Sequence, residues 1–213
     1  MKKVNLFLSA ILLAAMLLTS WRGVGNQNIV TIGDQLWMNE NLNVNKFRNG
    51  DVIPEVKTAE EWKKAGDNKQ PAWCYYDNNP VNGEKYGKLY NWYAVNDPRG
   101  LAPKGYHIPS DAEWTKLSDY LGGEDAAGIK MKSTSGWNRN GNGTNSSGFS
   151  GLPGGNRYSN VTFYDIGKYG NWWSSTADDA SVAWYRYLGY GNGFVSRYYD
   201  AKEKGLSVRC LRD

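Results

Sequence analysis

The chain has 213 residues, among them ten Trp, fifteen Tyr and five Phe. This length fits one domain, and no Pro/Ser linker, long run of charge or internal repeat divides it. The formal net charge is +4, but it falls close to zero once Lys2, Lys3 and Arg22 leave with an N-terminal signal. A nearly neutral domain gives no electrostatic argument for nucleic acid as a partner. Low aliphatic content and frequent turns argue against a helical bundle or a parallel-sheet enzyme.

Residues 1–25 are predicted to form a signal peptide, and residues 26–213 one domain. Lys2 and Lys3 precede the apolar stretch 4–18, which is too short for a comfortable membrane span. Leu18-Thr19-Ser20 has the shape of a lipoprotein box, but Trp21 stands where the lipid-bearing Cys belongs. An ordinary secretory signal is favoured over a lost lipobox. We therefore expect a secreted or cell-surface protein with no integral membrane span after signal removal.

In the first half of the chain, residues 28–37 predict a short hairpin that turns at Gly33-Asp34. Thr58-Ala59-Glu60-Glu61 is a capping box, so a short helix is expected to begin there and to end near Gly66. Two strands are predicted next, over residues 73–76 and 89–95, with a turn over 77–80 between them.

In the second half, Ser110-Asp111-Ala112-Glu113 is another capping box. The helix behind it would place Trp114, Leu117 and Leu121 on one face and stop at the glycine pair 122–123. Residues 133–171 predict a long, packed, irregular region, and strands are expected over 182–188, 194–197 and 206–211. The fold class is therefore α+β: two short helices with antiparallel sheets and long irregular loops, and the two ends of the chain brought together.

The two cysteines, Cys74 and Cys210, both lie in the predicted mature domain. In an exported chain two cysteines usually form one disulfide, which here would join the middle of the domain to its last strand. The alternative is a pair of buried free thiols.

Four ordered motifs carry a family resemblance: residues 88–95 (KLYNWYAV), 103–114 (PKGYHIPSDAEW), 147–150 (SGFS) and 205–210 (GLSVRC). Together they resemble the Fibrobacter succinogenes major paralogous domain from about residue 30 to the end. The resemblance implies a C-type lectin-like fold, shared with the formylglycine-generating enzymes, and an exported protein of Bacteroidetes or Fibrobacteres. The catalytic Cys pair of those enzymes has no counterpart here, because only Cys210 lies near the end of the domain.

The chain also resembles the target proteins of diversity-generating retroelements, which vary surface positions near the C-terminus of this fold. The stretch from Asp178 to Tyr199 is rich in Tyr, Asn, Asp, Ser and Gly, the residues that adenine mutation accumulates. Tyrosine offers stiff, amphipathic contact area, and Asn and Ser offer adaptable hydrogen bonds. The candidate ligand-binding residues are Asp178, Asp179, Tyr185, Tyr187, Tyr190, Asn192, Phe194, Ser196, Tyr198 and Tyr199.

Within that stretch Asn192 and the aromatic residues at 185, 187, 190, 194, 198 and 199 are expected on the exposed surface. Arg186, Val195 and Arg197 are better candidates for the scaffold. The alternative is that the aromatic rings complete a core poor in aliphatic residues, and this is the preferred interpretation of Trp172, Trp173 and Trp184. For the tyrosines both interpretations stay open.

No motif supports catalysis, a cofactor or a metal. The single histidine, His107, precedes a helix cap, and one His with two Cys cannot build a zinc site. Residues 148–152 fall short of G-x-S-x-G at Leu152, and no P-loop follows Gly154-Gly155. Val81 breaks the EF-hand order after Asp77-Asn78-Asn79, and Asp178-Asp179 suits a solvated turn better than a cation site.

The sequence thus predicts a non-catalytic protein that recognises an external protein or glycan through an aromatic C-terminal surface. The alternative is a structural or accessory subunit of a surface assembly that uses the same surface to contact other subunits. An enzyme is a third hypothesis, which no motif recommends.

Overall fold

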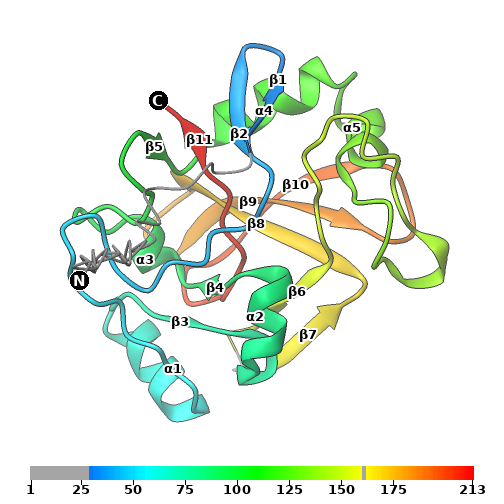
Figure 1. Ribbon diagram of the computed structural model, residues 1–213. Helices are drawn as coiled ribbons and strands as arrows, with labels where there is room; N and C mark the ends of the chain where they lie inside the picture. Colours follow the sequence, from blue (N-terminus) through cyan, green and yellow to red (C-terminus); the bar gives the residue numbers. More distant parts are fainter. Residues whose placement is uncertain (1–28, 160–161) are drawn as a thin grey trace, which may run out of the picture.

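The computed structural model describes residues 29–159 and 162–213; the predicted signal peptide lies outside this part. The described residues form five α-helices and eleven strands, so the α+β class is confirmed, although the sequence predicted only two helices (Figure 1). The helices are α1 Ala59–Asp67, α2 Pro80–Tyr86, α3 Trp92–Val95, α4 Asp111–Tyr120 and α5 Glu124–Met131. The strands are β1 Ile29–Ile32, β2 Gln35–Met38, β3 Trp73–Cys74, β4 Leu89–Tyr90, β5 Tyr106–His107, β6 Gly154–Arg157, β7 Phe163–Ile166, β8 Tyr169–Ala177, β9 Val182–Gly189, β10 Val195–Ala201 and β11 Leu211–Arg212.

The largest sheet has five strands in the order β10-β9-β8-β6-β7, and its long strands β8 and β9 cross the middle of the molecule (Figure 1). β9 pairs antiparallel with both β8 and β10, whereas β6 meets β8 in a parallel bridge. The C-terminal strands expected at 182–188 and 194–197 are therefore confirmed, and the second extends to Ala201. β9, with a partner on each edge, is the centre of the C-terminal half.

A second sheet, in the order β1-β2-β11-β5, joins the two ends of the described chain. Leu211 pairs with Trp37 on one side and with His107 on the other. The predicted hairpin is present, and its turn includes Gly33 at a φ of 64°, a conformation that favours glycine. This pairing confirms that the ends of the domain are brought together.

Both predicted capping boxes are present. The hydroxyl of Thr58 accepts from the amide of Glu61 at the start of α1, and that of Ser110 accepts from Glu113 at the start of α4. In each box the glutamate side chain also reaches back to the cap backbone, which satisfies two amides that the first helical turn leaves unpaired. These local signals fix both helix starts.

The segment 89–95 was predicted to be one strand, and that prediction is wrong beyond Tyr90. Only Leu89–Tyr90 pairs, with Trp73–Cys74, because the Asn91 side chain accepts from the amide of Ala94 and caps α3. The turn predicted over 77–80 instead leads into α2, where Asn79 is the cap and Pro80 the first residue. Proline fits that position because its missing N–H would be unpaired there.

Two further segments differ from the prediction. The irregular region 133–171 contains β6, β7 and the start of β8; β6 meets β8 in a parallel bridge and pairs antiparallel with β7 at the edge of the five-stranded sheet. The strand expected over 206–211 is regular only from Leu211, and the residues before it make isolated bridges from Leu206 to Tyr90 and from Ser207 to Trp172.

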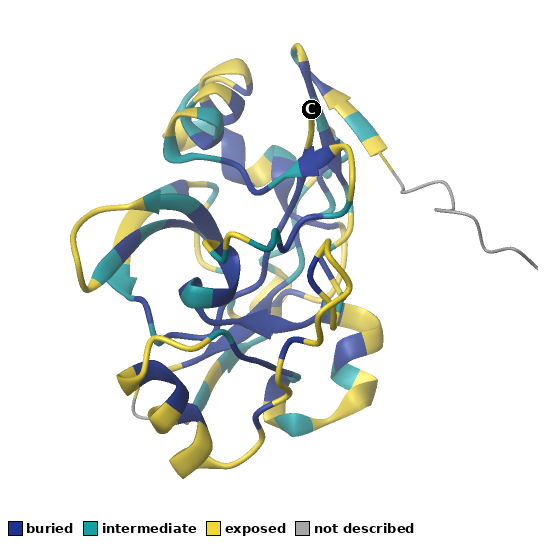
Figure 2. Ribbon diagram, turned by 90° about the vertical axis from the view of Figure 1, so that its left-hand side faces the viewer, coloured by how far each residue is buried: buried dark blue, intermediate teal, exposed yellow. Residues whose placement is uncertain are grey.

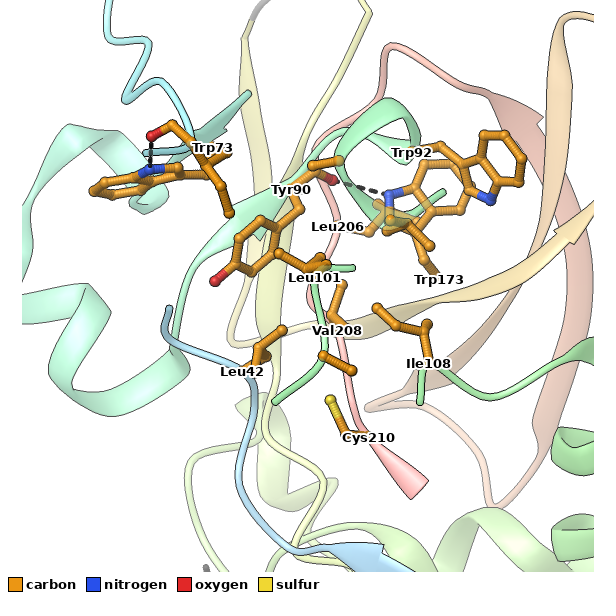
Figure 3. Close-up of a cluster of buried hydrophobic side chains, with 14 of the residues drawn as sticks. Leu42, Trp73, Tyr90, Trp92, Leu101, Ile108, Trp173, Leu206, Val208 and Cys210 are labelled. Carbon is orange, nitrogen blue, oxygen red and sulfur yellow. Dashed lines mark hydrogen bonds between the residues drawn. The ribbon is translucent and has the colours of Figure 1, made fainter. Parts of the chain in front are cut away.

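The core consists of three clusters of buried residues, and the central one surrounds Trp173 (Figure 3). Its indole groups are hydrogen-bonded as well as packed: Nε1 of Trp73 donates to the carbonyl of Ile53, and Nε1 of Trp92 to that of Ser174. The strands through the centre are mostly buried, whereas the helices expose their outer faces (Figure 2). Trp172 and Trp173 are fully buried, so their predicted core role is confirmed. Trp184 is only half-buried.

No helix in the described part of the chain is long and apolar enough to cross a membrane.

Several long cationic side chains are also buried, and backbone carbonyls hold them. The ammonium of Lys132 donates to the carbonyls of Gly141, Gly189 and Asn192. Carbonyls likewise accept from the other members of the group, which are Lys88, Arg157, Lys202 and Arg209. Such contacts satisfy a buried charge that would otherwise cost several kcal/mol, on the order given for an unpaired buried ion.

The predicted disulfide between Cys74 and Cys210 is absent, and both residues are buried free thiols. They belong to different clusters: Cys74 packs with Trp62 and Leu89, and Cys210 packs in the central cluster. Burial raises the pKa of each thiol to about 12. Each cysteine therefore behaves as a small apolar core residue, and the open alternative of two free thiols is correct.

A tyrosine-lined candidate binding site

A cavity of about 230 Å³ opens on the five-stranded sheet, between β6, β8, β9 and β10. We call it the tyrosine pocket. Its walls carry five tyrosines together with two amides, one carboxylate and one ammonium group. The lining residues are Asn156, Tyr158, Asp165, Tyr169, Asn171, Tyr185, Tyr187, Tyr198 and Lys204.

Strand register explains why these side chains meet. Tyr185 and Tyr187 alternate along β9 and so point to the same face of the sheet. Tyr198 of β10 lies opposite Tyr185, and Asn171 of β8 lies opposite Tyr187. Directly opposite residues share a face, so three strands supply one wall of the pocket.

The tyrosine rings contact one another: Tyr185 with Tyr198 and Tyr169 with Tyr187 meet edge to face, and Tyr185 with Tyr187 is tilted. Ring centroids lie 6.2 Å apart for Tyr185 and Tyr198, 6.0 Å for Tyr185 and Tyr187, and 5.9 Å for Tyr169 and Tyr187. Edge-to-face pairs at such distances are each worth about 0.5–1.5 kcal/mol beyond burial alone. The aromatic walls are thus held in place before any ligand arrives.

The polar groups of the pocket differ in how well they are satisfied. Lys204 donates to Asp200 at 2.6 Å and lies 4.1 Å from the ring centre of Tyr158. The amide nitrogen of Asn171 donates to the carbonyl of Gly155. In contrast, Oδ1 of Asn156 has no hydrogen-bond partner, although this side chain is only 4% exposed. A buried polar atom without a partner costs about 1–3 kcal/mol, so it calls for an explanation.

Two phenol groups of the pocket, those of Tyr158 and Tyr185, have a raised pKa. Burial, with the nearby carboxylate of Asp200, raises the pKa of Tyr185. The charge of Asp200, with burial, raises the pKa of Tyr158. Protonated phenols can both donate and accept, which suits recognition of a ligand that carries hydroxyl groups.

The predicted site residues fall into three groups. Tyr187 and Tyr198 both line the pocket. Tyr187 is half-buried, and Tyr198 is 54% exposed. Tyr185 also lines it, but the prediction that it lies on the exposed surface is wrong: this residue is only 6% exposed, because its ring packs in the central cluster against Trp173. Outside the pocket lie Asp178, Asp179, Tyr190, Asn192, Phe194, Ser196 and Tyr199.

Of these, Asn192, Phe194 and Tyr199 are exposed, as expected. Tyr190, which was also expected on the exposed surface, is half-buried, and so is Ser196. Tyr199 packs on Trp184, and its ring is stacked with that of Tyr198 at 5.4 Å. Tyr190 meets the pocket residue Tyr169 edge to face at 6.4 Å. The pocket is therefore bordered by further aromatic rings on at least two sides.

The pair Asp178-Asp179 forms an exposed turn. Oδ1 of Asp179 accepts from the amides of Ser181 and Val182, and these hydrogen bonds lower its pKa. Its carboxylate is committed to the turn, as in an Asx turn. Among the described residues no group of His, Cys, Asp and Glu is arranged to hold a metal ion.

The three residues expected to belong to the scaffold, Arg186, Val195 and Arg197, make contacts within the protein. Arg186 and Val195 are each 1% exposed, and Arg186 pairs with Asp111 at 2.6 Å. Arg197 is exposed, but it also pairs with Asp111 and lies 3.3 Å from the ring centre of Trp184. These three side chains therefore fix the sheet to α4 and to its neighbours.

Six pocket residues were not predicted from the sequence: Asn156, Tyr158, Asp165, Tyr169, Asn171 and Lys204. Five of them lie in or beside β6, β7 and β8, in a region with no periodic signal. Lys204 meets them because Arg157 and Gly205 form a bridge between distant parts of the chain. A sequence motif supplies a hint only for Lys204, which directly precedes the closing motif at Gly205.

A larger cavity of about 360 Å³ lies elsewhere, lined by Arg209, asparagines and the charged residues Glu40, Glu84 and Lys85. It has no aromatic wall. Its buried guanidinium already donates to Asn41 and to the carbonyls of Met38 and Phe149. Because binding sites combine apolar walls with a few convergent polar groups, the smaller tyrosine pocket is the better candidate.

Comparison with known proteins adds one match. The family model of the Fibrobacter succinogenes major domain matches residues 30–212, which is nearly the whole described part of the chain. No curated protein matches the chain.

Proposed function

We propose that this chain, which belongs to the Fibrobacter succinogenes major domain family, is an exported, non-catalytic protein that recognises an external ligand through the tyrosine pocket and the rings around it. The observation that carries the proposal is the pocket itself. Five tyrosines from four separate strands and loops converge on one cavity, together with amide, carboxylate and ammonium groups. Rigid amphipathic rings with a few fixed polar groups are the usual composition of a recognition site.

The fold that we propose is C-type lectin-like. The pairing of the first hairpin with the last strand, next to a larger and mostly antiparallel sheet that carries the proposed binding surface, supports it. Export is proposed from the basic and apolar start of the sequence. Retroelement diversification is proposed from the composition of residues 178–199, which include β9 and β10.

The proposal gives His107 a structural role. Its Nδ1 lies 2.7 Å from Oδ1 of Asp213, and its Nε2 lies 2.9 Å from Oε1 of Glu113. Both ring nitrogens are thereby engaged, and Glu113 is itself part of the capping box of α4. This ring joins the last residue of the chain to the helix, so a catalytic role is not part of the proposal.

The experiment is binding of purified protein to an array of glycans and to candidate surface proteins, with matched tyrosine variants. Tyr198→Ala should abolish binding with only a small loss of thermal stability, because the ring is more than half exposed and loses only its contacts with Tyr185 and Tyr199. Tyr120→Ala is the control, since Tyr120 is 66% exposed on α4, outside the pocket lining. Tyr185→Ala is not a suitable probe, because Tyr185 is buried in the central cluster and its loss would destabilise the core.

Equal binding by Tyr198→Ala and the parent would contradict the proposal. The same exposed rings could instead contact other subunits, since Tyr158, Tyr164, Tyr198 and Tyr199 are each at least 40% exposed. Such a structural role predicts stable self-association, which Tyr198→Ala would disrupt. Light scattering coupled to size-exclusion chromatography separates the two functions.

A further inference from the structure

We propose that the tyrosine pocket holds a single neutral pyranose ring, whose hydroxyl or amide N–H donates to the unpartnered oxygen of Asn156. This inference rests on the proposed function and names the chemical class of its ligand. It adds a chemical class of ligand to the general proposal of an aromatic surface. The three polar residues on which it depends, Asn156, Asn171 and Lys204, line the pocket but lie outside the segment 178–199.

The size of the cavity fits one ring. At about 230 Å³ it is smaller than the roughly 300–1,000 Å³ typical of sites for drug-sized ligands. It is also too small for a folded peptide segment. One ring seated in the pocket would leave the neighbouring exposed rings of Tyr158, Tyr198 and Tyr199 free to contact the next unit of a chain.

The wall chemistry fits a pyranose. Such a ring has apolar C–H faces and a perimeter of hydroxyl groups. The faces of the tyrosine rings match the C–H surfaces, while the two amides and the phenol hydroxyls match the perimeter. A purely apolar ligand would leave the amide groups of the pocket unsatisfied, at a cost that a hydroxylated ring avoids.

Asn156 supplies the independent observation. Its oxygen is buried without a partner, and the residue lies on β6 between Gly155 and Arg157, where the backbone leaves little freedom. Gly155 has a φ of 67°, and a Cβ there would lie 2.5 Å from the carbonyl oxygen of Tyr164. The amide is thus fixed beside the cavity while lacking a donor, and a ligand O–H or N–H is the group that completes it.

The charges of the pocket favour a neutral ligand. Lys204 is paired with Asp200 at 2.6 Å, and Lys168, beside the pocket, lies 4.0 Å from Asp165. Each of these cations already has a carboxylate partner, so an anionic sugar would gain no free positive charge. It would instead meet the carboxylates of Asp165 and Asp200.

The test is saturation-transfer difference NMR and calorimetry on the purified mature domain, with a panel of neutral methyl pyranosides, N-acetylhexosamines and glucuronic acid. We expect at least one neutral sugar to bind and glucuronic acid to bind at least tenfold more weakly than its neutral counterpart. Asn156→Leu should lower affinity for the neutral sugar at least tenfold without lowering the melting temperature. Tyr198→Ala should lower it as well, and it provides a second probe should Asn156→Leu fail to fold.

Asn39→Leu is the matched control, because Oδ1 of Asn39 also lacks a partner but lines the other cavity. It should leave sugar affinity unchanged. Unchanged affinity in Asn156→Leu, or tighter binding of glucuronic acid, would overturn the inference. If no monosaccharide binds while the array experiment still finds a ligand that depends on Tyr198, then the inference fails and the proposed function stands. If neither experiment finds a ligand that depends on Tyr198, both fail.

Discussion

The indole N–H of Trp173 donates to the backbone carbonyl of Tyr90, 2.9 Å away, across the central cluster (Figure 3). Trp173 lies on β8 of the large sheet, and Tyr90 lies in the short β4 pairing. Tyr90 in turn exchanges backbone hydrogen bonds with Leu206. The Trp173 side chain therefore connects the large sheet, through Tyr90, to the C-terminal segment that begins near Leu206.

Trp173→Phe should destabilise the protein by about 2–4 kcal/mol, because it leaves both a cavity and a buried carbonyl with one partner fewer. Urea unfolding followed by fluorescence measures this change. Trp184→Phe serves as the comparison, since Trp184 is half-buried and its N–H makes no such core contact. Equal losses in the two variants would show that the hydrogen bond to Tyr90 contributes little.

Asp111 neutralises a buried arginine. It pairs with Arg186, which is 1% exposed, and with Arg197, at 2.6 Å and 3.0 Å. Asp111→Asn should cost about 3–5 kcal/mol, because it leaves a buried guanidinium without its counter-charge. In the exposed pair of Asp34 with Lys116, Asp34→Asn should change stability little. Denaturant titration of the two variants, side by side, checks both expectations.

The same carboxylate predicts acid sensitivity. Burial opposes ionisation of Asp111, but hydrogen bonds and charge from Arg197 and Arg186 outweigh it and lower its pKa below 3.8. A lowered pKa in the folded state means that this stabilisation is present above pH 3.8 and is lost as the pH falls through the lower folded value. The free energy of unfolding of Asp111→Asn should therefore fall less than that of the parent as the pH decreases below 3.8, which acid titration of both proteins measures.

His107 predicts a change of stability at higher pH. Burial disfavours its charge, but the carboxylates of Asp213 and Glu113 outweigh burial and raise its pKa above 6.5. Its contribution is complete below pH 6.5 and is lost as the pH rises through the folded value. Melting temperatures between about pH 6 and pH 9 should therefore fall more for the parent than for His107→Gln. Parallel curves would show that this ion pair is unimportant.

The two thiols provide a chemical test of the core. Because burial raises their pKa to about 12, Cys74 and Cys210 should resist alkylation in the folded protein. After unfolding without reductant, mass spectrometry should find both cysteines alkylated. A protein that gains no alkyl groups until it is reduced would contain the disulfide that the sequence predicted. Reductant should also leave the melting temperature unchanged.

Diversification predicts a pattern in the flanking DNA. A near-copy of the stretch that encodes Ala177 to Asp213, differing at adenines and next to a reverse transcriptase gene, should be found within several kilobases. The altered codons should concentrate at surface positions such as Tyr187, Tyr198 and Tyr199 and should spare the buried Arg186 and Val195. A flanking region without such a copy would indicate a fixed binding surface.

Local signals allowed the parts of the fold that depend on neighbours in sequence to be predicted. The capping boxes at Thr58 and Ser110 and the hairpin at Gly33 are all present, because each depends on hydrogen bonds within a few residues. At Asn91 the aromatic run of 89–95 suggested a strand. The side chain of Asn91 instead caps α3. This outcome depends on the pairing of Leu89–Tyr90 with Trp73–Cys74, which the local sequence does not specify.

Only three of the nine residues that line the tyrosine pocket were predicted from the sequence. Tyr187 and Tyr198 could be found from composition and alternation, since both belong to long regular strands. Asn156 and Lys204 are far apart in sequence and meet only through the bridge between Arg157 and Gly205. The disulfide prediction was wrong for a related reason: it depended on the expected compartment, whereas a disulfide requires two sulfur atoms in the same part of the core.

The way Lys132 is held has a consequence for how this molecule can change over time. Its ammonium group grips main-chain oxygens at Gly141, Gly189 and Asn192, and every amino acid supplies such an oxygen. Gly191, which lies between two of these residues, can therefore be exchanged without loosening the loop, since an added Cβ there would meet no atom within 4 Å, whereas the ring of Tyr190 packs against Tyr169. Contacts to backbone carbonyls do not depend on which side chains the loop carries. The loop sequence can therefore change during evolution while Lys132 continues to hold its backbone in place.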